Sequence, residues 1–371
     1  MKEIVYIFKN GRTLRLENEE VQAKEFYYSL EYFQEKYQNL KVIEDQDKLN
    51  KKYLLVDRLL QKLNLPINLS KIINKKNLQI LKNADIIFST NPGLAITLYP
   101  FIKIFKKHRN IKFLTINSGI FTNIFNSKVR SNKLKNIIVE GFLQTIDGVI
   151  FTSKTEYEII SSFYPEYKTK FINQIFSIDT NFWTTEKISS QEKEGVLFIG
   201  NNQNRDFSLA IEIAALLPNI NFKFVTTKIN NSEHLPKNIK LIKGDWNQNI
   251  LSDSDIKDMY ETSRIVFLPV EDTLVASGQS VAMQSMSMGT PVIISKTTGF
   301  WDYKNFINDE NIFLIETNTA QNWADKINEL YEDYDLLNKI AHHGEELIHS
   351  KFNLEIFSNF LEAVFEFGNE D

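Results

Sequence analysis

The chain has 371 residues, 43% of them hydrophobic and 24% charged, which is the composition of a globular protein long enough for two domains. It has no cysteine, so disulfides and thiolate metal sites are excluded, and we expect neither a signal peptide nor a transmembrane span and therefore a cytoplasmic location. The formal net charge of −4 hides an asymmetry, because residues 1–176 hold 28 Lys and Arg against 17 Asp and Glu, while residues 177–371 hold 15 against 30.

The first half of the chain alternates apolar runs with stretches of helical periodicity, as a parallel α/β sheet requires. We predict strands at residues 4–8, 40–43, 85–89, 113–116 and 148–153, and a helix over residues 17–37. Loops that contain glycine or polar residues follow three of these strands, where ligands bind in open α/β sheets. The candidate ligand-binding residues of these loops are Gly11, Asn91, Asn117 and Ser118.

A basic segment lies between residues 51 and 135, where 17 Lys and Arg stand against two acids. Apolar residues interleave with the basic ones over 51–82 and 94–112, which we predict to form amphipathic helices with a break at Pro66 and a kink or break at Pro100. Basic amphipathic helices lie at membrane surfaces, so an anionic membrane is a candidate partner. Ordinary solvated helix faces are the alternative. No nucleic-acid partner is expected, because no recognition motif accompanies the charge.

The second half of the chain repeats the strand–loop–helix pattern. A strand at 196–199 leads into Gly200 and a polar loop, which places Arg205 just before a helix over 207–217. Arginine is a good bidentate partner for phosphate, and a surface acid is the alternative partner. The remaining elements predicted in this half are strands at 222–226, 239–243, 265–269, 292–295 and 311–315, and helices at 255–262, 320–331, 334–352 and 354–367.

The stretch over residues 265–297 is the most informative part of the chain. Its first strand is followed by an irregular loop and a helix, which we predict to be capped by Ser277 and to end at Gly289. The residues that open this helix are Ser277, Gly278, Gln279 and Ser280. A glycine beside a helix N-terminus lets a ligand approach bare backbone N–H groups, and the macrodipole there favours an anion. A phosphate-bearing ligand is therefore the candidate, and an ordinary capped turn is the alternative.

The segment SGQSVAMQSMSMGTPVI, from Ser277 to Ile293, resembles the donor-binding signature of GT-B glycosyltransferases of the retaining family four. Its tail, MGTPVI, matches the family closely. The family's two glutamates, separated by seven residues, fall here on Ala276 and Gln284 and are both replaced. The resemblance covers about residues 175–371 well and residues 1–174 in architecture only. It implies an α/β protein of the GT-B class, with two Rossmann-like domains facing a central cleft.

The resemblance also divides the chain. It implies an N-terminal acceptor-binding domain over residues 1–178, a C-terminal nucleotide-sugar-binding domain over residues 179–352, and a C-terminal helix over residues 353–371 that crosses back to the N-terminal domain.

Site residues follow from the same resemblance. Arg205 stands near the place of a lysine that binds the donor diphosphate, and Gln284 would bond the ribose in place of a glutamate. The implied donor-binding residues are Gly200, Arg205, Gly244, Asp245, Ser277, Gly278, Gln279, Ser280 and Gln284. The catalytic candidates are Glu271, Asp272 and Asn117, and the acceptor-side residues are Gly11, Asn91 and Ser118. Glu271 and Asp272 as solvated loop charges remain the alternative.

The function implied is the transfer of a sugar from a UDP- or GDP-sugar, which is a co-substrate rather than a cofactor, to a glycan or lipid-linked acceptor. No metal site is expected, because no Asp-x-Asp motif stands in a suitable loop. A catalytically silent GT-B subunit, which binds a nucleotide sugar or partners an active transferase, is the alternative. A GT-B epimerase is a third candidate, although its loops would need acidic and histidine residues that are missing here.

Overall fold

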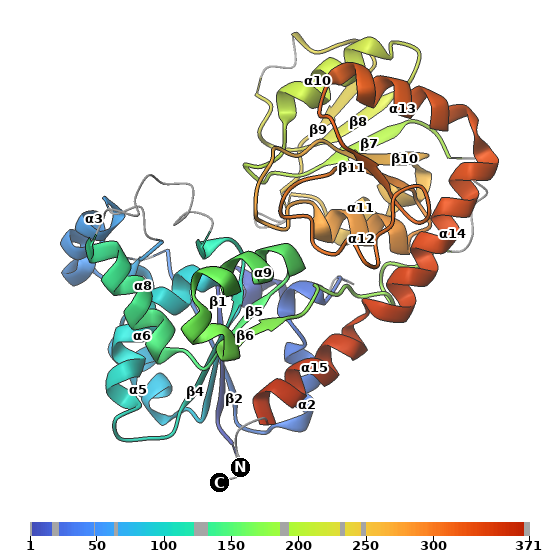
Figure 1. Cartoon of the computed structure of the whole chain (residues 1–371). Helices are drawn as coiled ribbons and strands as arrows, with labels where there is room; N and C mark the ends of the chain where they lie inside the picture. The colour runs from blue at the N-terminus through green and yellow to red at the C-terminus, as the bar shows by residue number, and fades with distance from the viewer. Residues whose placement is uncertain are drawn as a thin grey trace. The chain divides into compact units, whose positions relative to one another are not determined.

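Two compact units make up the chain in the computed structural model, which describes residues 2–16, 22–47, 49–62, 66–121, 133–185, 193–230, 234–245 and 250–366. Unit 1 consists of Met1–Glu19, Tyr27–Ile175 and Ser358–Asp371, and unit 2 of Glu20–Phe26 and Phe176–Phe357 (Figure 1). The chain therefore passes from unit 1 to unit 2 after Ile175 and returns after Phe357, where the sequence analysis set limits at residues 178 and 352.

Unit 1 is built on a six-stranded parallel sheet with the strand order β2-β1-β3-β4-β5-β6. Its strands are β1 (Ile4–Phe8), β2 (Leu40–Glu44), β3 (Ile86–Ser89), β4 (Lys112–Asn117), β5 (Gly148–Phe151) and β6 (Phe171–Asn173). Strands β1, β3 and β5 are buried along their whole length, as expected where helices cover both faces of a parallel sheet. Since β1, β3 and β4 are neighbours and run in parallel, the loops that follow them emerge at one edge of the sheet.

Helices surround this sheet. They are α1 (Arg12–Leu16), α2 (Leu30–Lys36), η2 (Lys51–Tyr53), α3 (Leu54–Gln61), α4 (Leu69–Ile72), α5 (Lys75–Asn83), α6 (Pro92–Phe105), α8 (Lys133–Thr145), α9 (Lys154–Phe163) and η4 (Pro165–Lys170). The last helix, α15 (Leu354–Glu366), begins in unit 2 and belongs to unit 1 from Ser358 onward. Its Phe365 ring packs 4.8 Å from the Phe33 ring and 5.6 Å from the Phe88 ring, so this end of the helix is part of the unit 1 core.

Unit 2 has the same architecture, with a six-stranded parallel sheet in the order β12-β11-β10-β7-β8-β9. Its strands are β7 (Val196–Ile199), β8 (Phe222–Val225), β9 (Ile239–Ile242), β10 (Ile265–Leu268), β11 (Val292–Ser295) and β12 (Phe313–Ile315). Its helices are α10 (Phe207–Leu216), α11 (Asp253–Thr262), α12 (Gln279–Ser287), α13 (Ala320–Glu332) and α14 (Tyr334–Lys351). The fold class predicted from the sequence, two Rossmann-like α/β domains, is confirmed. In the described part of the chain no helix is long and apolar enough to cross a membrane.

The helix predicted over residues 17–37 is wrong in its described part. Residues 22–24 are irregular, η1 (Glu25–Tyr27) is a single 3-10 turn, and only α2 is helical. Tyr28 and Ser29 interrupt the pattern because both adopt a left-handed backbone, with φ of 51° and 62°. Residues 17–21 lie outside the described residues. The described residues before the interruption, 22–26, belong to unit 2 rather than unit 1.

The basic stretches also differ from the expectation. The described residues between 51 and 83 form four short helices instead of the two pieces expected, namely η2, α3, α4 and α5. Helix α6 continues through Pro100, and its first half is core rather than surface, since Leu94, Ile96 and Leu98 are all buried. Exposed apolar side chains lie on α3, where Leu55 is 71% and Leu59 is 64% exposed, and in the second half of α6, where Ile104 is exposed.

Candidate active site

Arg205 is the most unusual side chain at the carboxyl edge of the unit 2 sheet. It follows β7 and is only 4% exposed, and its Nε donates a hydrogen bond to the carbonyl oxygen of Ile199 at 3.3 Å. Burial lowers its pKa to about 10. Its Nη1 is buried without a hydrogen-bond partner, and no described carboxylate forms an ion pair with it. A buried cation with an unused donor is costly unless an anion completes it.

Two glycines make room for this guanidinium. A Cβ on Gly200 would lie 2.6 Å from Nε of Arg205, and a Cβ on Gly278 would lie 3.2 Å from its Nη1. Both glycines also have a positive φ, of 150° and 88°, which side chains other than glycine adopt at a cost. Residues separated by 78 positions in the chain therefore converge on one cation, which brings together Gly200, Arg205 and Gly278 as the sequence analysis expected.

Gly278 is also the N-cap of α12, and no side chain caps this helix. The prediction that Ser277 is the cap is wrong, because its hydroxyl instead accepts a hydrogen bond of 2.8 Å from the Asn204 amide. The predicted end is confirmed, since Gly289 has the left-handed backbone of a helix terminator, with φ of 58°. The backbone N–H groups of the first turn thus stand beside Arg205 without a capping side chain. An anion at this point would meet both the helix dipole and the guanidinium.

Asn201, which follows β7, connects the carboxyl ends of three neighbouring strands by hydrogen bonds. Its amide donates to the carbonyl of Gly244 at 2.7 Å and accepts from the Thr226 hydroxyl and the Thr227 N–H, each at 2.8 Å. These bonds join the ends of β7, β8 and β9. Gly244 itself is tightly packed, since a Cβ there would lie 2.6 Å from Cγ1 of Val225, and Asp245 beside it is half-buried.

The loop after β10 presents its two acids differently. The Asp272 carboxylate accepts from the Thr298 N–H at 2.7 Å and from the Thr298 hydroxyl at 3.0 Å, so it ties this loop to the loop after β11. The Glu271 side chain is exposed, and none of the hydrogen bonds or ion pairs given for the described residues involves its carboxylate. Glu271 is therefore the acid of this loop that is available to a ligand.

Gln284 of α12 is part of a buried chain of hydrogen bonds. The sequence did not indicate this chain. The Glu25 Oε1 accepts from Gln284 Nε2 at 2.7 Å and from the Trp183 indole at 2.9 Å, and the Tyr260 hydroxyl donates to Gln284 Oε1 at 3.0 Å. Glu25 is 1% exposed and its Oε2 has no hydrogen-bond partner. Burial raises the pKa of Glu25 to about 7, against the opposing effect of the bonds from Gln284 and Trp183. A carboxylate thus reaches Gln284 from the segment 20–26.

Gln284 is engaged on both sides by this chain. Its amide oxygen faces Tyr260 and its amide nitrogen faces Glu25, and the side chain is only 6% exposed. Tyr260 in turn lies within electrostatic range of Arg205. No spacing rule links residue 25 to residue 284, so the contact could be found only in the folded chain.

Unit 1 carries its own set of polar residues at the carboxyl edge of its sheet. Gly11 follows β1 with φ of 95°, Asn91 caps α6 by accepting from the Leu94 N–H at 3.2 Å, and Asn117 and the exposed Ser118 end β4. Asn117 is fully buried, and its Nδ2 has no hydrogen-bond partner. The structure therefore brings these residues to one edge and leaves a buried amide donor among them. The described residues contain no group of three or more acidic or histidine side chains that could hold a metal ion.

Comparison with known proteins points to a glycosyltransferase. Residues 186–347 match the family model described as Glycosyl transferases group 1, which covers the segments around Arg205, Gly278 and Gln284. One curated relative, the capsular polysaccharide biosynthesis glycosyltransferase CapM of Staphylococcus aureus, is 29% identical over 86 residues. That alignment spans 23% of this chain and 22% of the relative.

Solved structures resemble nearly the whole chain. HepE of Anabaena in complex with UDP-glucose aligns with a TM-score of 0.66 at 12% identity, over 97% of this chain and 99% of that one. Sucrose-phosphate synthase of Thermosynechococcus elongatus aligns with a TM-score of 0.67 at 12% identity, over 98% of both chains. TarM of S. aureus aligns with a TM-score of 0.59 at 18% identity, over 78% of this chain and 59% of that one. The fold is GT-B, and together with the family match it supports a glycosyltransferase.

Proposed function

We propose that the chain is a glycosyltransferase that moves a sugar from a nucleoside-diphosphate sugar, a UDP- or GDP-sugar, to an acceptor. The observation that carries this proposal is the buried Arg205 between Gly200 and Gly278, with an unused donor beside the uncapped N-terminus of α12. Such a site matches a diphosphate, because it supplies a guanidinium with an unused donor beside the N-terminus of a helix that no side chain caps. The family match over residues 186–347 supports the same assignment.

The chemistry that these residues offer is stabilisation of a leaving group. As the bond between the sugar and the diphosphate breaks, negative charge builds on the phosphate oxygens, and Arg205 with the first turn of α12 would hold it. Fixed donors in a buried site need no reorganisation at that moment. Glu271 is our candidate to contact the sugar, with Asp272 positioning the loop through Thr298. Asn117 is the candidate on the acceptor side, through its buried amide donor.

We propose a glycan or a lipid-linked acceptor. The likeness to a glycosyltransferase named for capsular polysaccharide biosynthesis, and to a TarM structure that holds alpha-GlcNAc-glycerol and UDP, supports this proposal. The resemblance of residues 277–293 to the retaining family four supports this proposal, and in it Gln284 stands in the position of a family glutamate. The observation that favours a silent nucleotide-sugar-binding subunit instead is that both family glutamates are replaced. The contact between Glu25 and Gln284 argues against that reading, since it restores a carboxylate beside the helix.

We expect turnover to be independent of added metal. Incubation with a panel of UDP- and GDP-sugars and a glycan extract, followed by mass analysis, should give an acceptor heavier by one sugar and free nucleoside diphosphate. The rate should be the same in EDTA, because Arg205 and α12 neutralise the leaving group. Loss of product in EDTA and its recovery with magnesium or manganese would contradict metal independence. Nucleotide binding without any product would favour the silent subunit, and an isomerised sugar nucleotide would favour an epimerase.

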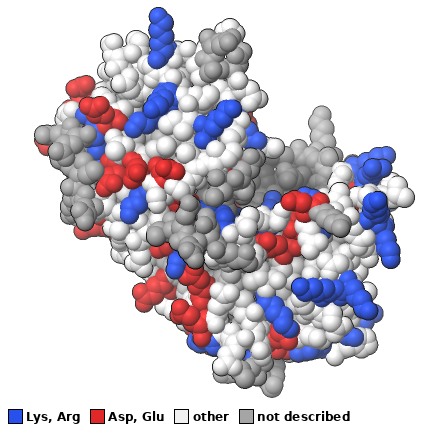
Figure 2. Space-filling model, turned by 180° about the vertical axis from the view of Figure 1, so that it is seen from behind, with Lys and Arg blue, Asp and Glu red and all other residues white. Residues whose placement is uncertain are grey.

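We also propose that unit 1 docks on an anionic membrane through α3 and η2. On α3, Leu55 and Leu59 are exposed one helical turn apart, and Lys51, Lys52 and Arg58 stand beside them. Figure 2 shows Lys and Arg side chains at the right-hand edge of the molecule, with uncharged side chains between them. Exposed leucines among basic residues suit an interface where acyl chains and anionic headgroups meet.

Liposome co-sedimentation tests the docking. We expect binding to vesicles that contain anionic lipid, little binding to neutral vesicles, and weakening with salt. The double variant Leu55→Ser and Leu59→Ser should bind at least about tenfold more weakly, because two leucines lose their burial in the interface. Leu216→Ser is the matched control, since Leu216 is an exposed leucine of unit 2, at 47%. Equal sedimentation with neutral and anionic vesicles, or an unchanged double variant, would refute the proposal.

A further inference from the structure

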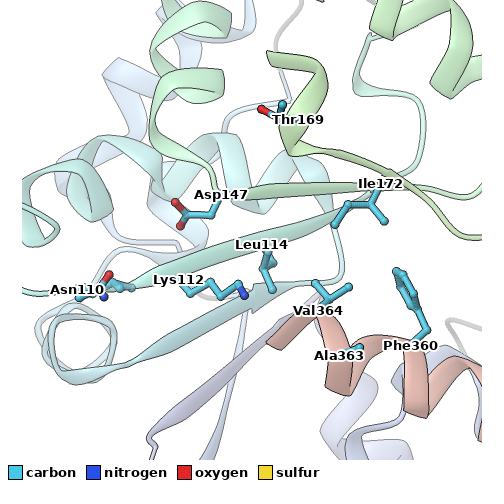
Figure 3. Close-up of a pocket in the computed structure, with 10 residues that line it drawn as sticks. Asn110, Lys112, Leu114, Asp147, Thr169, Ile172, Phe360, Ala363 and Val364 are labelled. Atoms are coloured by element: carbon cyan, nitrogen blue, oxygen red, sulfur yellow. The ribbon is translucent and has the colours of Figure 1, made fainter. Parts of the chain in front are cut away.

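A cavity of about 480 Å³ lies in unit 1 at the amino ends of β4, β5 and β6 (Figure 3). The loops that carry Gly11, Asn91 and Asn117 follow the carboxyl ends of their strands, so this cavity is at the opposite edge of the sheet. Its volume is within the range of small-molecule sites. The residues that line it are Asn110, Ile111, Lys112, Leu114, Asp147, Thr169, Ile172, Phe360, Ala363 and Val364.

The interior of the cavity is apolar. Leu114 of β4 and Ile172 of β6 form its floor, and Phe360, Ala363 and Val364 of α15 form the opposite wall, so that the groove runs between the sheet and the helix (Figure 3). The lack of a side chain at Gly148 of β5 leaves room for the two floor residues. A Cβ there would lie 2.7 Å from Cδ2 of Leu114 and 3.5 Å from Cδ1 of Ile172. An apolar ligand would therefore be covered on two sides.

One end of the cavity is positively charged. The half-buried Lys112 extends along it, and burial lowers the pKa of its ammonium. The nearby Asp147 acts in the opposite direction, and Lys2 acts in the same direction as burial. The one acid of the lining, Asp147, is already engaged, because its Oδ2 accepts from Lys106 Nζ and from the Phe113 N–H, both at 2.6 Å. Lys170 adds a third ammonium, which donates to the carbonyls of Leu143, Gln144 and Ile146. Positive charge exceeds negative charge at this end.

We propose that this cavity binds an anionic amphiphile, with its alkyl chain in the groove between Leu114, Ile172 and α15 and its acidic head on Lys112. An acidic head would form a charge-assisted hydrogen bond with the Lys112 ammonium, which is stronger in a half-buried site than in open water. An apolar chain would bury the exposed faces of Ile172, Phe360 and Val364. The site is separate from the proposed transfer reaction, so its test does not depend on activity.

Calorimetric titration of the full chain tests this site with decanoate, decyl phosphate and decanol. Both anions should bind with a stoichiometry of one, and the stronger of the two identifies the head group as carboxylate or phosphate. Lys112→Met should weaken the anions by about tenfold and leave decanol unchanged, because it removes the charge but keeps the apolar stem. Lys82→Met, on the exposed face of α5, is the matched control and should change nothing.

Two further variants close the groove itself. Ala363→Phe adds a ring at an exposed position of the α15 wall. Gly148→Ala displaces the Leu114 side chain from its position in the floor. Both variants should bind decanoate, decyl phosphate and decanol more weakly than the parent. The proposal is overturned if decanoate and decyl phosphate show no saturable binding, or if they bind Lys112→Met and Ala363→Phe as tightly as the parent chain.

Discussion

Replacing Arg205 with methionine is expected to weaken binding of UDP or GDP, whichever the chain prefers, by about 10- to 100-fold. The reason is that a charge-assisted hydrogen bond contributes roughly 1.5–3 kcal/mol, and this guanidinium holds a buried donor without a protein partner. Methionine is long enough to fill the space between Gly200 and Gly278, so the packing around the side chain should survive. The unpaired buried cation is removed at the same time, so the variant should be at least as stable as the parent.

Calorimetry on the parent, Arg205→Met and Lys240→Met measures this effect. Lys240 is an exposed lysine of β9, and its variant should keep the parent affinity. Thermal unfolding of each variant separates loss of the site from loss of the fold. If Arg205→Met binds the nucleotide as tightly as the parent, the diphosphate does not use this residue and the proposed donor site is wrong.

Changing Glu25 to glutamine should remove a pH dependence from the stability of unit 2. Below pH 4.5, the ordinary pKa, Glu25 is protonated in the folded and unfolded chains, and its raised pKa of about 7 means that the folded chain keeps the proton longer. The contribution of Glu25 to the free energy of unfolding is therefore fully present below about pH 4.5. It is lost as the pH rises to about 7, and the loss is up to about 3 kcal/mol. Glutamine keeps an acceptor for Gln284 and Trp183 but has no charge to titrate.

Denaturant unfolding of the parent and Glu25→Gln at a series of pH values checks this. Between pH 4.5 and 7.5, the unfolding free energy of the parent should fall relative to that of Glu25→Gln. Trp183 fluorescence reports on the same site, because its indole donates to Glu25. Glu212→Gln is the control, because Glu212 is an exposed acid of α10 and should give a difference that does not vary with pH. A constant difference for Glu25→Gln as well would mean that Glu25 is not held in the buried position described here.

The parts of the fold and site that could be predicted are those encoded in local sequence. The apolar runs that became β7, β10 and β11 needed only their own composition, since strands buried on both faces are apolar throughout. That Arg205 and Gly278 belong to one site was implied by the resemblance to GT-B glycosyltransferases. The strands needed only short segments, whereas the site needed the family signature as well.

The parts that could not be predicted depend on contacts between distant residues. Residues 20–26 look helical by periodicity, but the contacts of Glu25 with Trp183 and Gln284 draw them into unit 2. Ser277 is a favourable cap by type, yet Asn204 engages its hydroxyl and Gly278 takes the position. Tertiary hydrogen bonds decided both cases against local preference. The cavity beneath α15 likewise needs residues from β4, β6 and the end of the chain, which no local pattern joins.

The most direct measurement is a crystal structure of the chain with bound UDP or GDP, chosen by affinity. We expect the diphosphate to lie at the N-terminus of α12, with an oxygen within hydrogen-bond distance of Arg205 Nη1 and another facing the backbone N–H groups of Gln279 and Ser280. A nucleotide bound elsewhere, or one whose diphosphate leaves Arg205 Nη1 without a partner, would contradict it.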